Sequence, residues 1–319
     1  MPDETTRDPA APAASSGFQH MDGIETASSP PEALRQVLAV LDVQPDPERE
    51  NTFTGTSYRP PWGRIFGGQV LAQSLMAASR TVDDSAKHRP VHSLHAYFLR
   101  AGDPAVPISF DVDILRDGRS FSARRTQAIQ RGKPILSMIS SFQEPAEGLD
   151  HQVEMPKVPG PEELPTAEEL FGQLDIPAVQ QLLHSRPVDM RYVDGPLFLN
   201  PPKEPVGHQA IWFRASAPMP DDPLLHTALI AFASDYSLLE SVLRRHGLSW
   251  GNAGMKTASL DHAMWFHRAA RADEWLLYAQ ESPSASGARG MGLGRIFTAD
   301  GVLVASTAQE GMMRLPREE

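Results

Sequence analysis

The stretch Asp221–Gly247, with the sequence DDPLLHTALIAFASDYSLLESVLRRHG, decides the fold. It predicts one helix, because Asp222 can cap its start, Pro223 suits its first turn and Gly247 can close its end. Its middle is apolar nearly all round, which is typical of a buried helix. Asp235 lies in that middle. Burial of this carboxylate is costly unless another group donates a hydrogen bond to it.

The sequence that follows, LSWGNAGMKTASLDHAMWFH, predicts a strand over residues 255–267 that carries Ser259. The N-terminal half is predicted to form a strand, a helix and four antiparallel strands, over residues 51–58, 67–80, 91–99, 108–116, 120–131 and 134–143. The C-terminal half repeats this order over residues 208–215, 222–247, 255–267, 275–282, 287–298 and 301–313. The chain therefore reads as two copies of one α+β domain, each with a long apolar helix wrapped by an antiparallel sheet.

Polar residues recur at the same spacing in both halves. Steps of 24 and then 50 residues join Gln69, Ser93 and Gln143 in the first half, and Asp235, Ser259 and Gln309 in the second. Only the second set contains a potential general base, since a glutamine side chain cannot take a proton from water near neutral pH. The alternative for each of these residues is a structural role, because perturbed acids also serve structure.

Composition sets the domain boundaries. The chain is predicted to contain a disordered tail (residues 1–30), a first domain (31–145), a linker (146–203) and a second domain (204–319). The tail is rich in Pro, Ala, Ser, Thr and acidic residues, and it precedes an amphipathic helix over residues 31–41. Prolines recur in the linker, which we expect to hold only short helices near residues 167–174 and 178–183.

The totals exclude several classes of function. With 29 basic and 40 acidic residues among 319, the net charge of −11 argues against broad binding to nucleic acid or anionic membranes. The absence of cysteine excludes disulfides, thiolate metal sites and a cysteine nucleophile. No apolar run approaches a membrane span, no secretory signal is visible, and the last residues are not a peroxisomal tripeptide. We therefore expect a cytoplasmic protein without metal or other cofactor.

Other candidate sites are weaker. Asp261 and His262 with Ser259 suggest a serine triad, but adjacent strand residues face opposite sides of a sheet, and the chain has no G-x-S-x-G motif. His92 and His95 are discounted as metal ligands for the same reason. We therefore expect structural roles for His262 and His267.

Two surface patterns remain open. The glycines of residues 290–294 precede no helix, so we expect them to let a strand bend rather than to bind phosphate. A basic group in the first half is usually a solvated face, but it is also a candidate for meeting phosphates. It consists of Arg116, Arg119, Arg124, Arg125, Arg131 and Lys133.

Seven segments carry a family resemblance: Arg64-Ile-Phe-Gly-Gly-Gln-Val, His92-Ser-Leu-His-Ala-Tyr-Phe-Leu-Arg, Leu115-Arg-Asp-Gly-Arg-Ser-Phe-Ser-Ala-Arg-Arg, Ala233-Ser-Asp, Ser259-Leu-Asp-His-Ala-Met-Trp-Phe-His, Glu274-Trp-Leu-Leu-Tyr and Ala308-Gln-Glu-Gly. Together they resemble the acyl-CoA thioesterase II family, the double-hotdog thioesterases, over roughly residues 31–314. The resemblance implies two fused hotdog domains that hydrolyse fatty acyl-CoA to free acid and CoA. The family's catalytic acid, hydroxyl residue (Thr in some members) and glutamine fall on Asp235, Ser259 and Gln309.

The resemblance also implies a mechanism. The three residues would hold one water, Asp235 would draw off its proton, and backbone N–H groups near Gly67 and Gly68 would stabilise the oxyanion. The expected partner is the acyl-CoA substrate, and we expect a homo-oligomer. Two rival functions are a non-catalytic acyl-CoA binding protein and another hotdog activity such as a hydratase, which would usually pair an Asp with a His.

Overall fold

The structure is a computed structural model that describes residues 27–58, 63–82, 89–174, 176–198 and 201–316. The expected disordered tail lies outside the described residues up to residue 26. The helices are α1 (Pro30–Leu41), α2 (Gly67–Ser79), the 3-10 helix η1 (Pro161–Glu163), α3 (Ala167–Phe171), α4 (Pro177–His184), α5 (Pro223–Ser234) and α6 (Glu240–Arg245). The strands are β1 (Gln44–Pro45), β2 (Thr52–Gly55), β3 (Val91–Phe98), β4 (Ile108–Asp117), β5 (Phe121–Gln130), β6 (Lys133–Gln143), β7 (Val188–Tyr192), β8 (His208–Ala215), β9 (Lys256–Ser259), β10 (Asp261–Phe266), β11 (Leu276–Ser286), β12 (Arg289–Thr298) and β13 (Leu303–Arg314).

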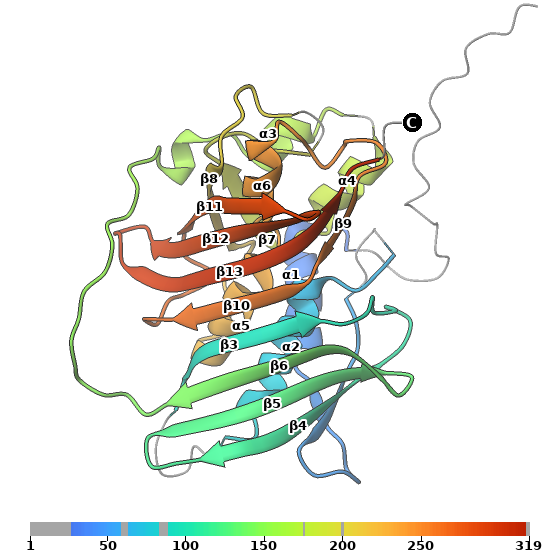
Figure 1. Cartoon of the computed structure of the whole chain (residues 1–319), viewed down its shortest axis with the longest axis vertical. Helices are drawn as coiled ribbons and strands as arrows, with labels where there is room; N and C mark the ends of the chain where they lie inside the picture. The colour runs from blue at the N-terminus through green and yellow to red at the C-terminus, as the bar shows by residue number, and fades with distance from the viewer. Residues whose placement is uncertain (1–26, 59–62, 83–88, 175, 199–200, 317–319) are drawn as a thin grey trace, which may run out of the picture.

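These strands form one antiparallel sheet whose two halves have the same order (Figure 1). In the first half the order is β2-β4-β5-β6-β3, and in the second it is β8-β11-β12-β13-β10. The two halves join where β3 pairs with β10, with Ser93 opposite Trp265 and Tyr97 opposite Asp261. The duplicated order predicted from the sequence is therefore confirmed, as are the two hotdog units.

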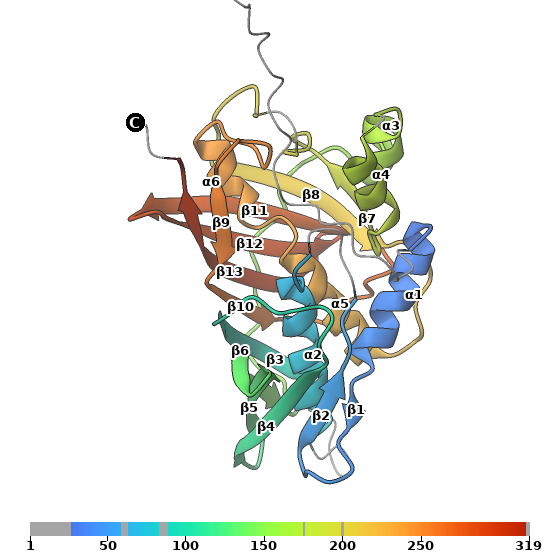
Figure 2. The same ribbon diagram turned by 90° about the vertical axis from the view of Figure 1, so that its right-hand side faces the viewer.

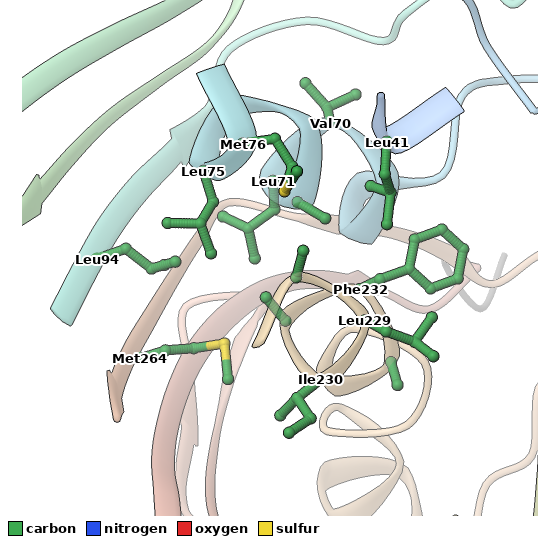
Figure 3. Packing of buried hydrophobic residues seen from close by; sticks show 14 of the residues in the cluster. Leu41, Val70, Leu71, Leu75, Met76, Leu94, Leu229, Ile230, Phe232 and Met264 are labelled. Atoms are coloured by element: carbon green, nitrogen blue, oxygen red, sulfur yellow. The ribbon is translucent and has the colours of Figure 1, made fainter. Parts of the chain in front are cut away.

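The helices lie on one face of this sheet (Figure 2). Helix α2 packs against β3, β4, β5 and β6, and α6 packs against β8, β11 and β12, while α5 packs against α2. Figure 3 shows α2 and α5 side by side, with Leu94 of β3 and Met264 of β10 on their sheet side. Leu71 and Phe232, one from each helix, are completely buried. Burial of a leucine or phenylalanine side chain contributes about 1.5–3 kcal/mol to stability, so this layer holds the two halves together.

The long helix expected over residues 222–247 is wrong, because the chain breaks between α5 and α6. Side chains from neighbouring strands donate hydrogen bonds to the backbone carbonyls at this break. Tyr278 donates its hydroxyl to the Ser234 carbonyl at 3.2 Å, and Gln209 donates its amide to the Ser237 carbonyl at 3.2 Å. A helix end requires such partners for its last carbonyls. Asp235 is therefore the C-cap residue of α5 and not a mid-helix acid.

Two further elements differ from the expectation. The strand predicted over residues 255–267 is divided at Leu260, whose backbone bonds Glu310 on one side and Phe98 on the other. The stretch expected to be a linker contains β7, which pairs with β8 at the sheet edge. Its sequence, Val-Asp-Met-Arg-Tyr, alternates as a strand does.

Candidate active site

Asp235 begins a tight turn over residues 235–239 that leads from α5 into α6. Glycines on the facing strands make room for this turn. A Cβ atom on Gly292 would lie 2.6 Å from the Leu238 carbonyl oxygen, and one on Gly311 would lie 2.4 Å from the Leu239 side chain. Gly292 therefore allows the backbone of the turn to approach the sheet closely, a use that the sequence did not indicate.

The structure brings all three predicted residues together. The Gln309 amide nitrogen donates to Asp235 Oδ1 at 2.6 Å and to Ser259 Oγ at 3.0 Å. The Ser259 hydroxyl lies at 3.5 Å from Asp235 Oδ1, the long limit of a hydrogen bond. Pairing of β9 with β13, with Ser259 opposite Gly311, places the serine and the glutamine side by side.

The first half of the chain completes the surroundings of Asp235. The Gly68 backbone N–H, in the first turn of α2, donates a hydrogen bond to the Asp235 carboxylate. A Cβ atom on Gly67 would lie 2.7 Å from Asp235 Oδ2, so the helix start approaches the carboxylate as closely as glycine allows. The N-terminus of a helix carries partial positive charge and favours an anion there. The site is therefore built from both halves of the chain.

Opposing effects set the protonation of Asp235. Burial raises its pKa to about 6, against the lowering effects of hydrogen bonds from Gln309, Gly68 and Ser259 and of the Arg64 charge. A carboxylate with this pKa is ionised at neutral pH yet is more basic than an exposed aspartate. That combination suits a general base.

Asp261 and His262 have structural contacts of their own, although His262 is also a neighbour of the Gln309 side chain. Asp261 Oδ1 accepts a hydrogen bond from the Glu310 backbone N–H at 2.7 Å. His262 is completely buried and its Nε2 lies 2.9 Å from Ser234 Oγ. Burial lowers the pKa of His262 to about 4, and the Gln309 side chain opposes this shift. The imidazole is therefore neutral at physiological pH, as expected of a structural histidine.

The corresponding residues of the first half do not converge. No hydrogen bond joins Gln69, Ser93 and Gln143, all three of which lie in the described part of the chain. Gln69 instead donates its amide to Gln73 Oε1 at 3.0 Å and to the Thr56 carbonyl at 3.4 Å. Its environment is therefore a buried structural one.

A cavity of about 680 Å³ opens beside Asp235 and Ser259. Both halves contribute apolar side chains to its wall, including Ile65, Phe98, Leu136, Met190, Phe198 and Leu239. Gly67 also lines the cavity, so the start of α2 faces the same space. This wall is chemically suited to a hydrocarbon chain.

The basic group singled out in the sequence does not line this cavity. Arg124 is buried and pairs with Asp117, Arg125 pairs with Asp113, and Arg131 pairs with Asp103.

Two other arginines, Arg64 and Arg100, line the cavity and are exposed. Sequence reasoning missed both, although Arg64 begins one of the quoted motifs and Arg100 ends another. The described helices include none that is both long and apolar enough to cross a membrane.

Known families match both halves of the chain. A family model described as acyl-CoA thioesterase matches residues 197–312, and one described as acyl-CoA thioesterase N-terminal domain matches residues 57–143. Human acyl-coenzyme A thioesterase 8 is 40% identical over 306 residues, which cover 92% of this chain and 94% of that protein. Acyl-CoA thioesterase 2 of Haemophilus influenzae is 39% identical, over 82% of this chain and 92% of its own length.

Solved structures agree. The acyl-CoA thioesterase II of Mycobacterium marinum is 42% identical and superposes with a TM-score of 0.72, covering 88% of this chain and 98% of that one. A hot dog fold protein from Alicyclobacillus acidocaldarius shares the fold at 18% identity, with a TM-score of 0.69, covering 88% of this chain and 99% of its own. The motifs, the fold and these similarities together establish that the chain belongs to the acyl-CoA thioesterase II family of thioester hydrolases.

Proposed function

We propose that this acyl-CoA thioesterase hydrolyses fatty acyl-CoA to free fatty acid and CoA by means of a water that Asp235, Ser259 and Gln309 activate together. The observation that carries the proposal is the convergence of Gln309 and Ser259 on Asp235 at the wall of an apolar cavity. No covalent intermediate is required, because the base acts on water directly.

Each residue has a distinct part in this proposal. Asp235 takes a proton from the water as the water oxygen attacks the thioester carbonyl carbon. The C–S bond then breaks, and the CoA thiolate leaves and takes up the proton that Asp235 accepted, which restores the carboxylate. Ser259 and Gln309 hold the water and fix the orientation of the carboxylate through their hydrogen bonds. The raised pKa of Asp235, about 6, makes it a stronger base than an exposed aspartate while leaving it ionised at pH 7.

The start of α2 is the proposed place for the developing oxyanion. The first amides of a helix have no acceptor within the helix and point out from its end. The Gly68 amide is directed at Asp235, whereas Gly67 lines the cavity beside it. We assign the Gly67 amide to the oxyanion, where a preorganised donor is worth most because the charge appears only during reaction.

The same geometry orients the substrate. The acyl chain occupies the apolar cavity, and the CoA phosphates lie toward the exposed Arg64 and Arg100, whose guanidinium groups suit phosphate oxygens.

Replacement of the base tests the proposal directly. Asp235→Asn keeps size and hydrogen-bonding reach, so kcat for palmitoyl-CoA should fall roughly 10²–10⁴-fold while KM changes little. Release of free CoA thiol, followed with a thiol reagent, measures this. Asp261→Asn is the matched control, because Asp261 contacts the Glu310 backbone and does not line the cavity. Near-normal turnover by folded Asp235→Asn would remove Asp235 as the base.

The rival functions have less support. A binding protein would hold palmitoyl-CoA without releasing thiol, so the same assay separates it from a hydrolase. A hydratase would usually pair its acid with a histidine, and none of the described residues that line the cavity is a histidine.

Domain limits, assembly and location remain predictions. We propose the two domains over residues 31–145 and 204–319, a homo-oligomeric assembly and a cytoplasmic location. A Saccharomyces cerevisiae relative, 26% identical, is named a peroxisomal acyl-coenzyme A thioester hydrolase, which is the alternative compartment to test. Light scattering of the purified chain at several concentrations measures the assembly, and a monomer at all of them would contradict it.

A further inference from the structure

The glutamine that contacts Asp235 has a second buried neighbour. Met264 of β10 lies opposite Thr307 of β13. The next residues on the same face, toward the same end of these two strands, are His262 in β10 and Gln309 in β13. His262 is completely buried and Gln309 is 1% exposed. The imidazole therefore lies beside the amide that holds the proposed base.

Each of these two side chains has one buried polar atom left over. The Gln309 amide nitrogen donates to Asp235 and Ser259, so its Oε1 is at the opposite end of the amide. Within the described residues that oxygen has no hydrogen-bond partner, and neither has Nδ1 of His262. Buried polar atoms without a partner are costly. An N–H group at Nδ1 of His262 would satisfy both atoms at once.

The other ring nitrogen decides whether Nδ1 carries the proton, since a neutral imidazole has only one N–H. Nε2 of His262 lies 2.9 Å from the Ser234 hydroxyl, which also lies 2.8 Å from the Ala231 carbonyl oxygen. A hydroxyl proton directed at Ala231 makes Nε2 the donor and leaves Nδ1 as a bare acceptor facing another acceptor. A hydroxyl proton directed at Nε2 makes Nδ1 the donor. Only the second arrangement satisfies both ring nitrogens of His262 and the Gln309 oxygen.

We propose that His262 is a positioning residue for the reaction: its Nδ1–H donates to Gln309 Oε1, and the Ser234 hydroxyl donates to its Nε2. Hydrogen bonds then run from α5, at the residue before Asp235, through β10 to the amide on β13. They fix the amide relative to the base. His262 does not line the cavity, so it acts only through Gln309. The inference rests on the proposed thioesterase function and adds a residue to that site.

The contribution of His262 is largest while Asp235 is neutral. An ionised Asp235 accepts only, so its charge alone keeps the Gln309 amide nitrogen turned toward it. Once Asp235 has taken the proton of the water, it carries an O–H donor, for which the amide oxygen is the better partner. Rotation of the amide would bring its oxygen to Asp235 and remove a donor from Ser259. The Nδ1–H of His262 opposes this rotation, because the rotation would break its hydrogen bond to the oxygen.

The protonation of the ring gives a test that does not require turnover. Heteronuclear NMR of the ring nitrogens shows which of them carries the proton, and loss of the signal in His262→Asn assigns it. We expect Nδ1–H in the wild type and a change to Nε2–H in Gln309→Ala, where the acceptor is gone. A histidine held only by Ser234 would show the same tautomer in both proteins. Nε2–H in the wild type would overturn the inference.

Two substitutions separate the contacts of the two ring nitrogens. The amide nitrogen of a glutamine can replace Nε2, whereas that of an asparagine can replace Nδ1. His262→Gln keeps the contact with Ser234 and loses the donor to Gln309, so kcat for palmitoyl-CoA should fall about 5- to 30-fold while KM changes less than about threefold. His262→Asn restores the donor and should recover most of that loss. Thiol release measures both.

His226→Gln is the matched control. His226 is also a buried histidine of the second half with one unpartnered ring nitrogen, Nε2, among the described residues. Its Nδ1 accepts from the Ala272 backbone N–H at 3.0 Å, and the residue does not line the cavity. Its replacement should change kcat by less than about threefold, whatever it does to thermal stability.

A double substitution distinguishes positioning from a merely structural role. Because His262 acts through the Gln309 amide, His262→Gln should lower kcat no further once Gln309→Ala is present. Equal fold losses in both backgrounds would overturn the inference. If circular dichroism shows that His262→Gln is unfolded, the tautomers of the wild type and of Gln309→Ala still decide it. Normal turnover by Asp235→Asn would end the proposed function, whereas the NMR result would still show whether His262 holds Gln309.

Discussion

Gln69, in the first turn of α2, and Asp235, the C-cap residue of α5, occupy matching stations of the repeat but lie in different surroundings. In the first half α2 runs without interruption through Gln69, which is completely buried and bonds Gln73 and Thr56. In the second half the chain breaks at Asp235, and the break turns that side chain toward the cavity. A local change in helix continuity thus separates a structural amide from a candidate base.

The strand partners differ as well, although the spacing in sequence is equal. Ser259 lies opposite Gly311, two residues after Gln309, whereas Ser93 lies opposite Ser141, two residues before Gln143. The pairing therefore differs by four residues between the halves, and Gln143 cannot occupy the place of Gln309. Equal spacing identified the stations of the repeat but not their pairing, because bulges and strand breaks shift register without changing the count of residues.

Transfer of the acid to the first half gives the largest expected effect. Gln69→Asp would bury a carboxylate beside two hydrogen-bond acceptors, the Thr56 carbonyl and Gln73 Oε1, which cannot donate to it. At pH 7 this variant should therefore be less stable than Gln69→Asn by about 3–5 kcal/mol. Urea unfolding of the two variants, matched in size, measures this difference. Gln69→Asp should also fail to restore activity when it is combined with Asp235→Asn. Equal stability of the two variants would mean that the first station can hold a charge, and the comparison would fail.

The raised pKa of Asp235 gives a pH signature of up to about 3 kcal/mol, since about two pKa units separate the folded and unfolded forms. An acid with a raised folded pKa binds its proton more tightly when folded. Wild type should therefore lose stability relative to Asp235→Asn as pH rises from about 4 to about 6, and the difference should be constant above about 7. Urea unfolding across this range measures it, and Gln69→Asn should show no such window against wild type. In the same series, wild-type kcat/KM should rise with pH through about 6. A flat difference would mean that Asp235 is not perturbed.

Truncation of the two glutamines should produce the smallest effects and the clearest contrast. Gln309→Ala removes the donor to Asp235 and Ser259, so kcat should fall about 10- to 100-fold, the worth of a hydrogen bond to a charged group. Gln143→Ala should change kcat by less than about threefold. Thiol release measures both, and circular dichroism checks that each variant is folded. A comparable loss in Gln143→Ala would show that the first half has a catalytic role.

Local pattern predicted much of this molecule, and contacts between distant elements account for what it missed. The repeated order and spacing located Asp235, Ser259 and Gln309, and the apolar periodicity located the core. The break after Ser234 could not be predicted, because the groups that stabilise it, Tyr278 and Gly292, come from other strands. Propensity alone favours a continuous helix there.

The arginines show the same limit. Lysine and arginine are most often solvated, so sequence alone does not distinguish Arg64 and Arg186, which line the cavity, from Arg124 and Arg125, which form ion pairs elsewhere. Their roles depend on which strands meet at the cavity, and the strand β7 beside Arg186 forms only through pairing with β8.

The close approach of Gly67 and Gly68 to the second half has an evolutionary consequence. The matching residues in the second half are Ala233 and Ser234, and both carry a Cβ atom. A Cβ atom at the position of Gly67 would lie 2.7 Å from the Asp235 carboxylate, and one at the position of Gly68 would lie 2.3 Å from the Phe232 carbonyl oxygen. A protein assembled from two copies of the second half would have two aspartates at this station. In neither copy could the helix start approach the aspartate as closely as it does here. The first half is therefore needed to complete the surroundings of Asp235, because its two glycines leave the space that the carboxylate of the second half occupies.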